Sequence, residues 1–297
     1  MPDHTSPEMR HLAEPAPRHV DLFTQATILC GGFMQQFGWV FFAIGSLMAW
    51  LFIPASEARF WLEPRGGWQE APGTIISFES TNASVNDQLV YKYQHVFDLD
   101  GRVYTGSSYS LGQPYQVGEE VTVRYRSKAP EVSHIPGTQR AIFPPFVLLV
   151  LIFPLVGLGF IIPATVRNLK AIWLLKHGAF TRGKIVGQEY TNATVTINNV
   201  AYPVYKYYFE FSVGGRTHTA TCRTYQDWKV EDEEEEIILY DRHNPSNSLV
   251  FDAAPNMPPI VRGRLRPAPP GKAVYLILPL LGIGINLWFY WYGSPLE

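Results

Sequence analysis

Residues 141–166 read AIFPPFVLLVLIFPLVGLGFIIPATV and contain no charged side chain. A helix needs about 20 apolar residues to cross the hydrocarbon core of a bilayer, and soluble helices rarely run so far without a charge. Backbone amides in lipid must be satisfied within the segment, so we expect a helix here. Pro144, Pro145 and Pro154 leave open a kink, or a re-entrant segment that does not cross.

Two further uncharged stretches lie toward the ends of the chain, between Leu22 and Ser56 and between Ala273 and Leu296. Tryptophan and tyrosine residues stand near their ends, as in the aromatic belt of a membrane interface. The first stretch is much longer than the core of a signal peptide, which favours a retained anchor. We therefore expect a polar arm at residues 1–21 and three transmembrane segments, at residues 22–55, 141–166 and 273–293.

Basic residues are concentrated in the loop between the second and third segments. That loop carries Arg167, Lys170, Lys176, Arg182, Lys184, Arg262, Arg264, Arg266 and Lys272 near its ends. Because lysine and arginine near the spans favour the inner side, we expect the N-terminus in the cytoplasm and the C-terminus outside. Residues 56–140 would then lie outside, and residues 179–253 inside.

The two polar regions that flank the central segment are copies of one domain. Gly73–Ala83 and Gly183–Ala193 are identical at six of eleven positions, and Val90–Gly106 and Val204–Ala220 are identical at eight of seventeen. The second copy is four residues longer between these blocks, which we interpret as a longer loop. The duplication predicts two domains with the same fold.

Each copy has the pattern of β-structure. Apolar and polar residues alternate over Tyr91–Leu99 and over Tyr205–Val213, which is typical of half-buried strands. Asp100-Gly101 and Gly214-Gly215 follow at once, and such pairs suit a type I′ hairpin turn. Further strands are expected at residues 74–78, 121–125, 184–187 and 237–240. We predict an α+β membrane protein with two small antiparallel sheets or partly open barrels, each of roughly five strands.

The second copy closes on Tyr240-Asp241-Arg242-His243-Asn244-Pro245-Ser246. With the Gly-x-Ile/Val strand and the Tyr-x-Tyr strand before it, this motif resembles a broad family of bacterial membrane proteins known as domain of unknown function 3592. The resemblance covers about residues 70–136 and 178–252, and the first copy departs from the closing motif because Tyr125–Pro130 lacks the Asp and the Asn. It implies a bacterial inner (plasma) membrane, and the family supplies no established activity to carry over.

Two connecting segments join these parts. Residues 167–178 are amphipathic, so they either lie along the membrane surface or extend the second span. Residues 254–272 form a linker rich in proline and arginine.

Polar and small residues inside the spans are expected to join helices. Gln35 and Gln36 are placed to hydrogen-bond to another helix or to lie at the interface. Gly157 and Gly159 in the second span, with Gly282 and Gly284 in the third, are expected to allow close helix packing. No ionisable residue lies within a span, which disfavours transport by this chain alone.

The sequence contains no nucleophile elbow, phosphate-binding loop, dinucleotide fingerprint or paired-histidine zinc motif. Of the two cysteines, Cys30 lies in or beside a hydrophobic segment and Cys222 lies in a polar domain, so a disulfide between them is not expected. His95 aligns with Phe209 on the inward face of a strand and is expected to be a satisfied core histidine. We predict no catalytic residue, cofactor or metal, and the net charge of -2 argues against nucleic-acid binding.

Six consecutive acidic residues stand out in the second copy: Glu231, Asp232, Glu233, Glu234, Glu235 and Glu236. Like charges repel one another and require water or cations. The run is therefore a solvated turn, a contact for a basic partner, or a divalent-cation site with a spacing unlike known calcium loops.

The main hypothesis is a non-catalytic membrane protein that contacts lipid and binds other membrane protein subunits, as a scaffold or accessory subunit of a larger complex. Exposed sheet edges available for strand addition favour it. Two alternatives remain open: an immunity or stress protein that neutralises a toxin at the membrane, and an enzyme at the membrane face.

Overall fold

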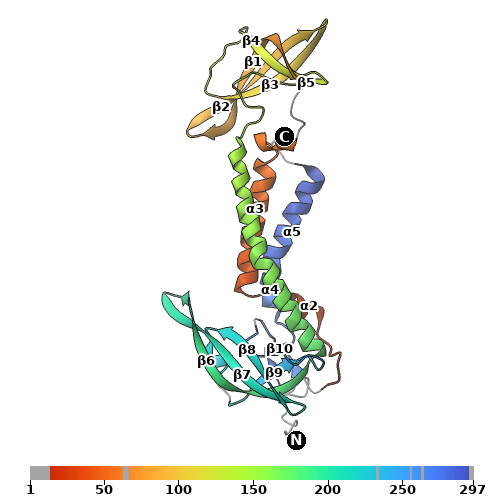
Figure 1. The fold of residues 1–297 in the computed structure, drawn as a ribbon, viewed down its shortest axis with the longest axis vertical. Helices are drawn as coiled ribbons and strands as arrows, with labels where there is room; N and C mark the ends of the chain where they lie inside the picture. The colour runs from red at the N-terminus through yellow and green to blue at the C-terminus, as the bar shows by residue number, and fades with distance from the viewer. Residues whose placement is uncertain (1–13, 63–66, 232–233, 255, 262–263, 294–297) are drawn as a thin grey trace. The chain divides into compact units, whose positions relative to one another are not determined.

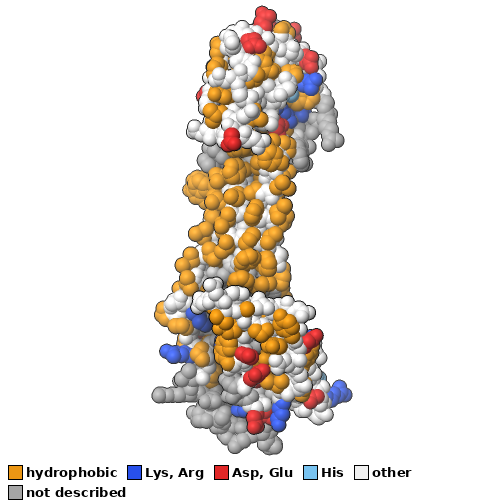
Figure 2. All heavy atoms as spheres, turned by 90° about the vertical axis from the view of Figure 1, so that its left-hand side faces the viewer, with side chains coloured by type: hydrophobic (Ala, Val, Ile, Leu, Met, Phe, Trp, Pro, Cys, Tyr) orange, Lys and Arg blue, Asp and Glu red, His pale blue; other side chains and the backbone are white. Residues whose placement is uncertain are grey.

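The computed structural model describes residues 14–62, 67–231, 234–254, 256–261 and 264–293 (Figure 1). Three helices are long and apolar enough to cross a membrane, and two five-stranded antiparallel sheets accompany them. The chain divides into two compact units, Met1–Phe42 with Val156–Gly282 and Ala43–Leu155 with Ile283–Glu297. Hydrophobic side chains cover the visible face of the helices, as Figure 2 shows.

The helices are α2 (Leu22–Cys30), α3 (Phe33–Phe52), α4 (Ile152–His177) and α5 (Val274–Tyr292), with short 3-10 turns at Glu57–Leu62, Pro145–Leu151, Asp227–Lys229 and Pro270–Ala273. The first predicted span is therefore two helices, and the expectation of one segment over residues 22–55 was wrong. The chain breaks at Gly31-Gly32, where Gly32 has a φ of 91° that favours glycine. Of these two helices, only α3 is long enough to span a membrane.

Side-chain amides satisfy the carbonyls that this break exposes. Asn168 Nδ2 donates to Leu29 O (3.0 Å), and Gln36 Nε2 donates to Cys30 O (2.6 Å) and to a carbonyl at the start of α5 (2.9 Å). Gln35 Nε2 donates to a threonine hydroxyl of α4 (3.2 Å). The last carbonyls of a helix need such partners. Of the two expectations for the glutamines, hydrogen bonding to another helix is the one that the structure shows.

The central segment is one long helix. Together with its leading 3-10 turn it spans Pro145–His177 without a reversal of direction, so the structure contains no re-entrant loop there. Residues 167–177 continue α4, which selects the second of the two interpretations of the amphipathic connector. Pro163 lies inside the helix without ending it.

Two of the four span glycines lie at close helix contacts. A Cβ atom on Gly157 would lie 2.6 Å from a backbone nitrogen of α3, and one on Gly282 would lie 3.0 Å from a tryptophan ring of α3. A Cβ atom on Gly159 or Gly284 would meet nothing within 4 Å among the described residues. The prediction of close packing is thus confirmed for Gly157 and Gly282 and wrong for Gly159 and Gly284.

The first sheet, sheet 1, has the strand order β3-β2-β1-β4-β5. Its strands are β1 (Trp68–Val85), β2 (Gln88–Leu99), β3 (Arg102–Leu111), β4 (Glu120–Arg126) and β5 (Ala129–His134). The buried face carries Ile75, Tyr93, Phe97 and Val123. All its strand pairs are antiparallel.

The second sheet, sheet 2, has the order β10-β9-β6-β7-β8, which corresponds strand by strand to sheet 1. Its strands are β6 (Ala179–Ile197), β7 (Val200–Val213), β8 (Arg216–Thr224), β9 (Glu236–Tyr240) and β10 (Ser248–Val250). The duplicated fold is confirmed, and both sheets are open rather than closed barrels. The linker at residues 254–272 includes a small ribbon of β11 (Ile260–Val261) and β12 (Arg264–Leu265).

The four-residue difference between the copies lies in a hairpin and not in a loop. Strands β1 and β2 meet at Asn86-Asp87, and β6 and β7 meet at Asn198-Asn199; all four residues have positive φ, as a type I′ turn requires. Four extra residues lengthen each arm by two. Because side chains alternate with period two, this insertion keeps every apolar residue on its original face.

Sheet 2 is packed directly on the end of α4. Leu174 and Leu175 of the helix form one buried cluster with Ile28 of α2, Leu239 of β9 and Phe251. Only one residue, Gly178, separates α4 from β6. The helix and the sheet therefore share a continuous core.

The N-terminal arm joins this core through a buried arginine. The Arg18 guanidinium donates to Leu175 O (3.0 Å) and Gly178 O (2.7 Å), and Arg18 N donates to Lys176 O (2.8 Å). The side chain is only 3% exposed. A positive charge at a helix C-terminus is favourable, because the last carbonyls carry partial negative charge.

Candidate functional site

The acidic run is largely occupied by contacts within the chain. Glu231 accepts a hydrogen bond from the Tyr207 hydroxyl (2.7 Å). Burial, and secondly this carboxylate, raises the pKa of Tyr207. Glu235 lies 3.5 Å from Lys184 Nζ. Asp232 and Glu233 lie outside the described residues.

The last residue of the run has left the turn altogether. Glu236 begins β9 opposite Gly183 and is only 2% exposed. Glu234 is exposed. The four described residues of the run, which was predicted as a possible contact for a partner, therefore occupy different environments: Glu231 and Glu234 are exposed, Glu235 is partly buried and Glu236 is buried.

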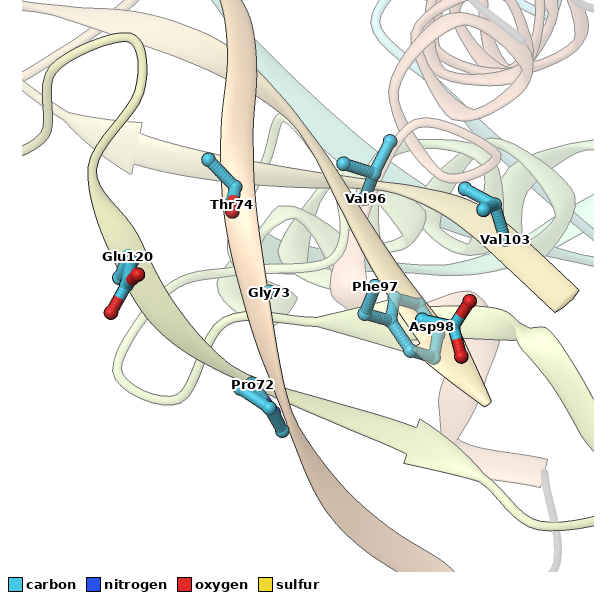
Figure 3. A pocket seen from close by; sticks show the side chains of 8 residues that line it. All are labelled: Pro72, Gly73, Thr74, Val96, Phe97, Asp98, Val103 and Glu120. Atoms are coloured by element: carbon cyan, nitrogen blue, oxygen red, sulfur yellow. The ribbon is translucent and has the colours of Figure 1, made fainter. Parts of the chain in front are cut away.

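A hollow on sheet 1 offers no pair of converging carboxylates. It is lined by Pro72, Gly73, Thr74, Val96, Phe97, Asp98, Val103 and Glu120. Figure 3 shows that the two acidic side chains stand on opposite sides of β1. Asp98 Oδ1 also accepts from Gly101 N (2.9 Å), which supports the hairpin turn. The arrangement gives these carboxylates no shared proton or cation.

His95 is a core histidine, as predicted, but it is not fully satisfied, because its buried Nδ1 atom has no hydrogen-bond partner among the described residues. It is fully buried, and its Nε2 lies 3.0 Å from Ser133 Oγ. Burial, with a smaller contribution from His134, lowers the pKa of His95 to about 4. The imidazole is therefore neutral near pH 7, and no substrate reaches it from solvent.

Metal-ligating groups do not converge in the part of the chain that the structure describes. No cluster of three histidine, cysteine, aspartate or glutamate side chains there has the geometry to hold an ion. Cys30 and Cys222 are both free thiols. Burial, and secondly Glu236, raises the pKa of Cys222 to about 12, so its thiol is not activated as a nucleophile.

The edge strand of sheet 1 is bonded along its second half. Tyr109 N donates to Gln139 O (2.7 Å) and Gln139 N donates to Tyr109 O (2.8 Å). One residue earlier, Ser108 Oγ accepts from Ile135 N (2.9 Å). The segment after β5 therefore covers this part of β3 and occupies its outward backbone groups.

The corresponding strand of sheet 2, β8, lies near β10, but among the described residues it has no backbone hydrogen bonds like those that cover β3. Cys222 stands where the first copy has Ser108, and a thiol is a much weaker acceptor than a hydroxyl. The chain after β10 turns back onto β9 instead, through Phe251 N and Ile237 O (2.9 Å). Among the described residues, β8 pairs with β7 alone. We take this open edge as the candidate site.

Sequence reasoning had predicted exposed edges in general but had not separated the two copies. The difference between the two edges had one signal in the sequence: at aligned positions the first copy has Ser108 and the second has Cys222. Neither a family model nor a curated protein matches the chain. The resemblance to domain of unknown function 3592 therefore stays a prediction.

Proposed function

We propose that the chain is a non-catalytic integral membrane protein that binds an extended segment of another protein at β8, as a scaffold or accessory subunit of a larger membrane complex. The observation that carries the proposal is the open edge of β8, contrasted with the covered edge of β3.

Strand β8 has the features of an edge that accepts a partner strand. It is nine residues long and contains no proline, and its two arginines, Arg216 and Arg223, lie near its ends and leave the centre of the strand uncharged. Thr217, Thr219 and Thr221 are exposed along it, and β-branched residues favour extended structure. An added strand would satisfy its outward backbone groups while neighbouring side chains supply selectivity.

The acidic run gives the partner a preferred charge. Glu234 is exposed, and Glu231 and Glu235 are not fully enclosed by the contacts that they make. A basic segment would be attracted to this surface, and the attraction would weaken as salt is added.

A contact within the first unit supports the proposed orientation. Arg18 precedes the first span and Gly178 follows the second, yet the two are hydrogen-bonded. Thr24 Oγ1 also accepts from Ala268 N (2.9 Å), just before the third span. These contacts bring the three regions together, which supports a topology in which both α3 and α4 cross and all three regions share one side of the membrane. The excess of lysine and arginine favours the cytoplasm for that side.

We therefore propose a multi-pass protein of the bacterial inner membrane, with the N-terminus and sheet 2 in the cytoplasm and with sheet 1 and the C-terminus outside. The bacterial assignment rests on the family resemblance.

The test is to extract the tagged chain from its native membrane in a mild detergent and to determine the mass and composition of the particle. We expect defined companion subunits. Thr219→Lys, which places a charge on the open edge, should release them. Thr105→Lys changes the aligned and equally exposed position of β3 and should retain them.

Two results would oppose the proposal. A particle that contains only this chain under every mild condition would remove the scaffold role. Equal loss of the companions in both variants would show that β8 is not the binding edge.

A further inference from the structure

Three aromatic rings of sheet 2 form a nearly equilateral group. The ring centroids lie 6.3 Å apart for Tyr202 and Tyr225, 6.4 Å for Tyr202 and Trp228, and 6.3 Å for Tyr225 and Trp228. Their planes meet at 54°, 68° and 76°, so no two rings are stacked. Tyr202 lies in β7, Tyr225 directly follows β8, and Trp228 lies in the 3-10 turn after it.

This spacing places all three rings within reach of a single bound cation. A point equidistant from three centroids about 6.3 Å apart lies ~3.7 Å from each, and a cation is attracted to an aromatic face within about 6 Å of its centroid. Trp228 is 53% exposed, whereas Tyr202 and Tyr225 are half-buried. The group is therefore accessible from solvent through Trp228 and held by two partly buried rings.

The surroundings of the group are negative. Asp227 precedes Trp228 and accepts a hydrogen bond from its backbone N–H (2.9 Å). The acidic run begins at Glu231, after Lys229 and Val230, so one exposed lysine stands among these negative charges. Among the described residues of this unit, the cation–π contact is that of Lys206 over Tyr208 (4.6 Å), so no lysine or arginine there lies over the three rings.

Packing of the sheet does not require these rings. The aligned positions of the first copy are occupied by Gln88, Leu111 and Pro114, and sheet 1 has the same strand order without an aromatic residue at any of them. A large apolar side chain such as Trp228, held half in solvent next to two other rings, is better explained by recognition than by the core.

We propose that Tyr202, Tyr225 and Trp228 form an aromatic cage that binds a quaternary ammonium group. The group is carried either by a free solute, such as choline or betaine, or by the choline headgroup of a lipid. Methylated ammonium ions suit this site better than a primary ammonium, because their methyl groups pack against rings and need no hydrogen-bond acceptor. The cage adjoins the open edge of β8, because Tyr225 directly follows that strand. Its ligand is a small cation and not an extended segment, so a choline titration tests the cage without testing the proposed scaffold role.

The first experiment titrates the full chain, in a maltoside detergent, with choline and with its neutral isostere 3,3-dimethylbutan-1-ol, by calorimetry. We expect choline to bind about tenfold more tightly, because only the cation interacts with the ring faces electrostatically. Trp228→Leu should abolish the binding of choline, and Trp228→Phe should keep most of it. Trp173→Leu removes a similarly exposed tryptophan of α4 and serves as the control.

A second arm identifies the source of the group. The chain is placed in lipid discs of pure phosphatidylglycerol or of an equal mixture with phosphatidylcholine, and the choline affinity is measured again. Competition from the mixed discs would assign the lipid headgroup, and unchanged affinity would assign the free solute. The proposal is overturned if the isostere binds as tightly as choline, if Trp228→Leu binds choline normally, or if neither choline, betaine nor phosphatidylcholine binds.

Discussion

The Nε2 atom of His95 lies 3.0 Å from the Oγ atom of Ser133 in the core of sheet 1. In sheet 2 the same position is Phe209, which is equally buried. Gly106 opposes His95 and leaves room for the hydrogen-bonded pair, whereas Ala220 opposes Phe209. The two copies thus differ in one buried site, where a titratable ring replaces an apolar ring.

This difference predicts that acid destabilises sheet 1 selectively. Burial lowers the pKa of His95 to about 4, and burial followed by Arg140 and Arg124 lowers that of His134 to about 4. The folded state then binds fewer protons than the unfolded state between about pH 6.5 and 4. The free energy of unfolding of sheet 1 is therefore highest above about pH 6.5 and decreases as the pH falls from about 6.5 toward 4.

Hydrogen exchange of β2 and β7, corrected for the intrinsic pH dependence of exchange, checks this prediction. Protection of β2 should decline below about pH 6, while β7, which carries Phe209, should be affected less. His95→Phe should reduce the decline in β2. Parallel loss of protection in both strands would contradict a histidine origin.

The contact of Gly157 with α3 predicts a cost for any added side chain. Gly157→Ala places a Cβ atom 2.6 Å from backbone nitrogen, which cannot move aside as a side chain would, and overpacking of this kind costs about 1–3 kcal/mol. Gly159→Ala meets nothing within 4 Å among the described residues and should be neutral or slightly stabilising. Unfolding by sodium dodecyl sulfate titration compares the two, and equal stabilities would disprove the close contact.

Arg18 is expected to hold the junction of α4 and β6. Arg18→Ala removes the guanidinium bonds to Leu175 O and Gly178 O and leaves these carbonyls without that donor, which should cost about 1–3 kcal/mol. Hydrogen exchange at residues 174–182 should rise accordingly. His19→Ala, at the exposed neighbouring position, should leave exchange unchanged, and an equal effect of both changes would assign the role to the arm as a whole.

Cys222 should resist alkylation in the folded chain. Burial, and secondly Glu236, raises its pKa to about 12, so at pH 8 it holds ~1000-fold less thiolate than a thiol with its ordinary pKa. In a Cys30→Ser background, iodoacetamide should label the native chain slowly and the denatured chain rapidly, as followed by mass spectrometry. Rapid labelling of the native chain would show that the thiol is open to solvent.

Features with a local signal were predictable from the sequence. The three spans, the duplication and the hairpin turns follow from uncharged stretches, repeated residues and glycine or aspartate pairs. The break at Gly31-Gly32 was missed because the flanking residues are uniformly uncharged, and the amides that stabilise it come from distant positions, such as Asn168. The aromatic group was missed because sequence does not give the orientation of three rings.

The contact between Arg18 and the end of α4 joins residues that are 157 and 160 positions apart in the chain. At about 5–20 residues per second, a ribosome would release the arginine roughly 8–30 s before its last acceptor, Gly178. Until then the guanidinium stays exposed at the membrane surface. An incomplete chain that stops before Gly178 therefore displays an arginine that the finished chain buries, and a quality-control protease could distinguish the two by that residue.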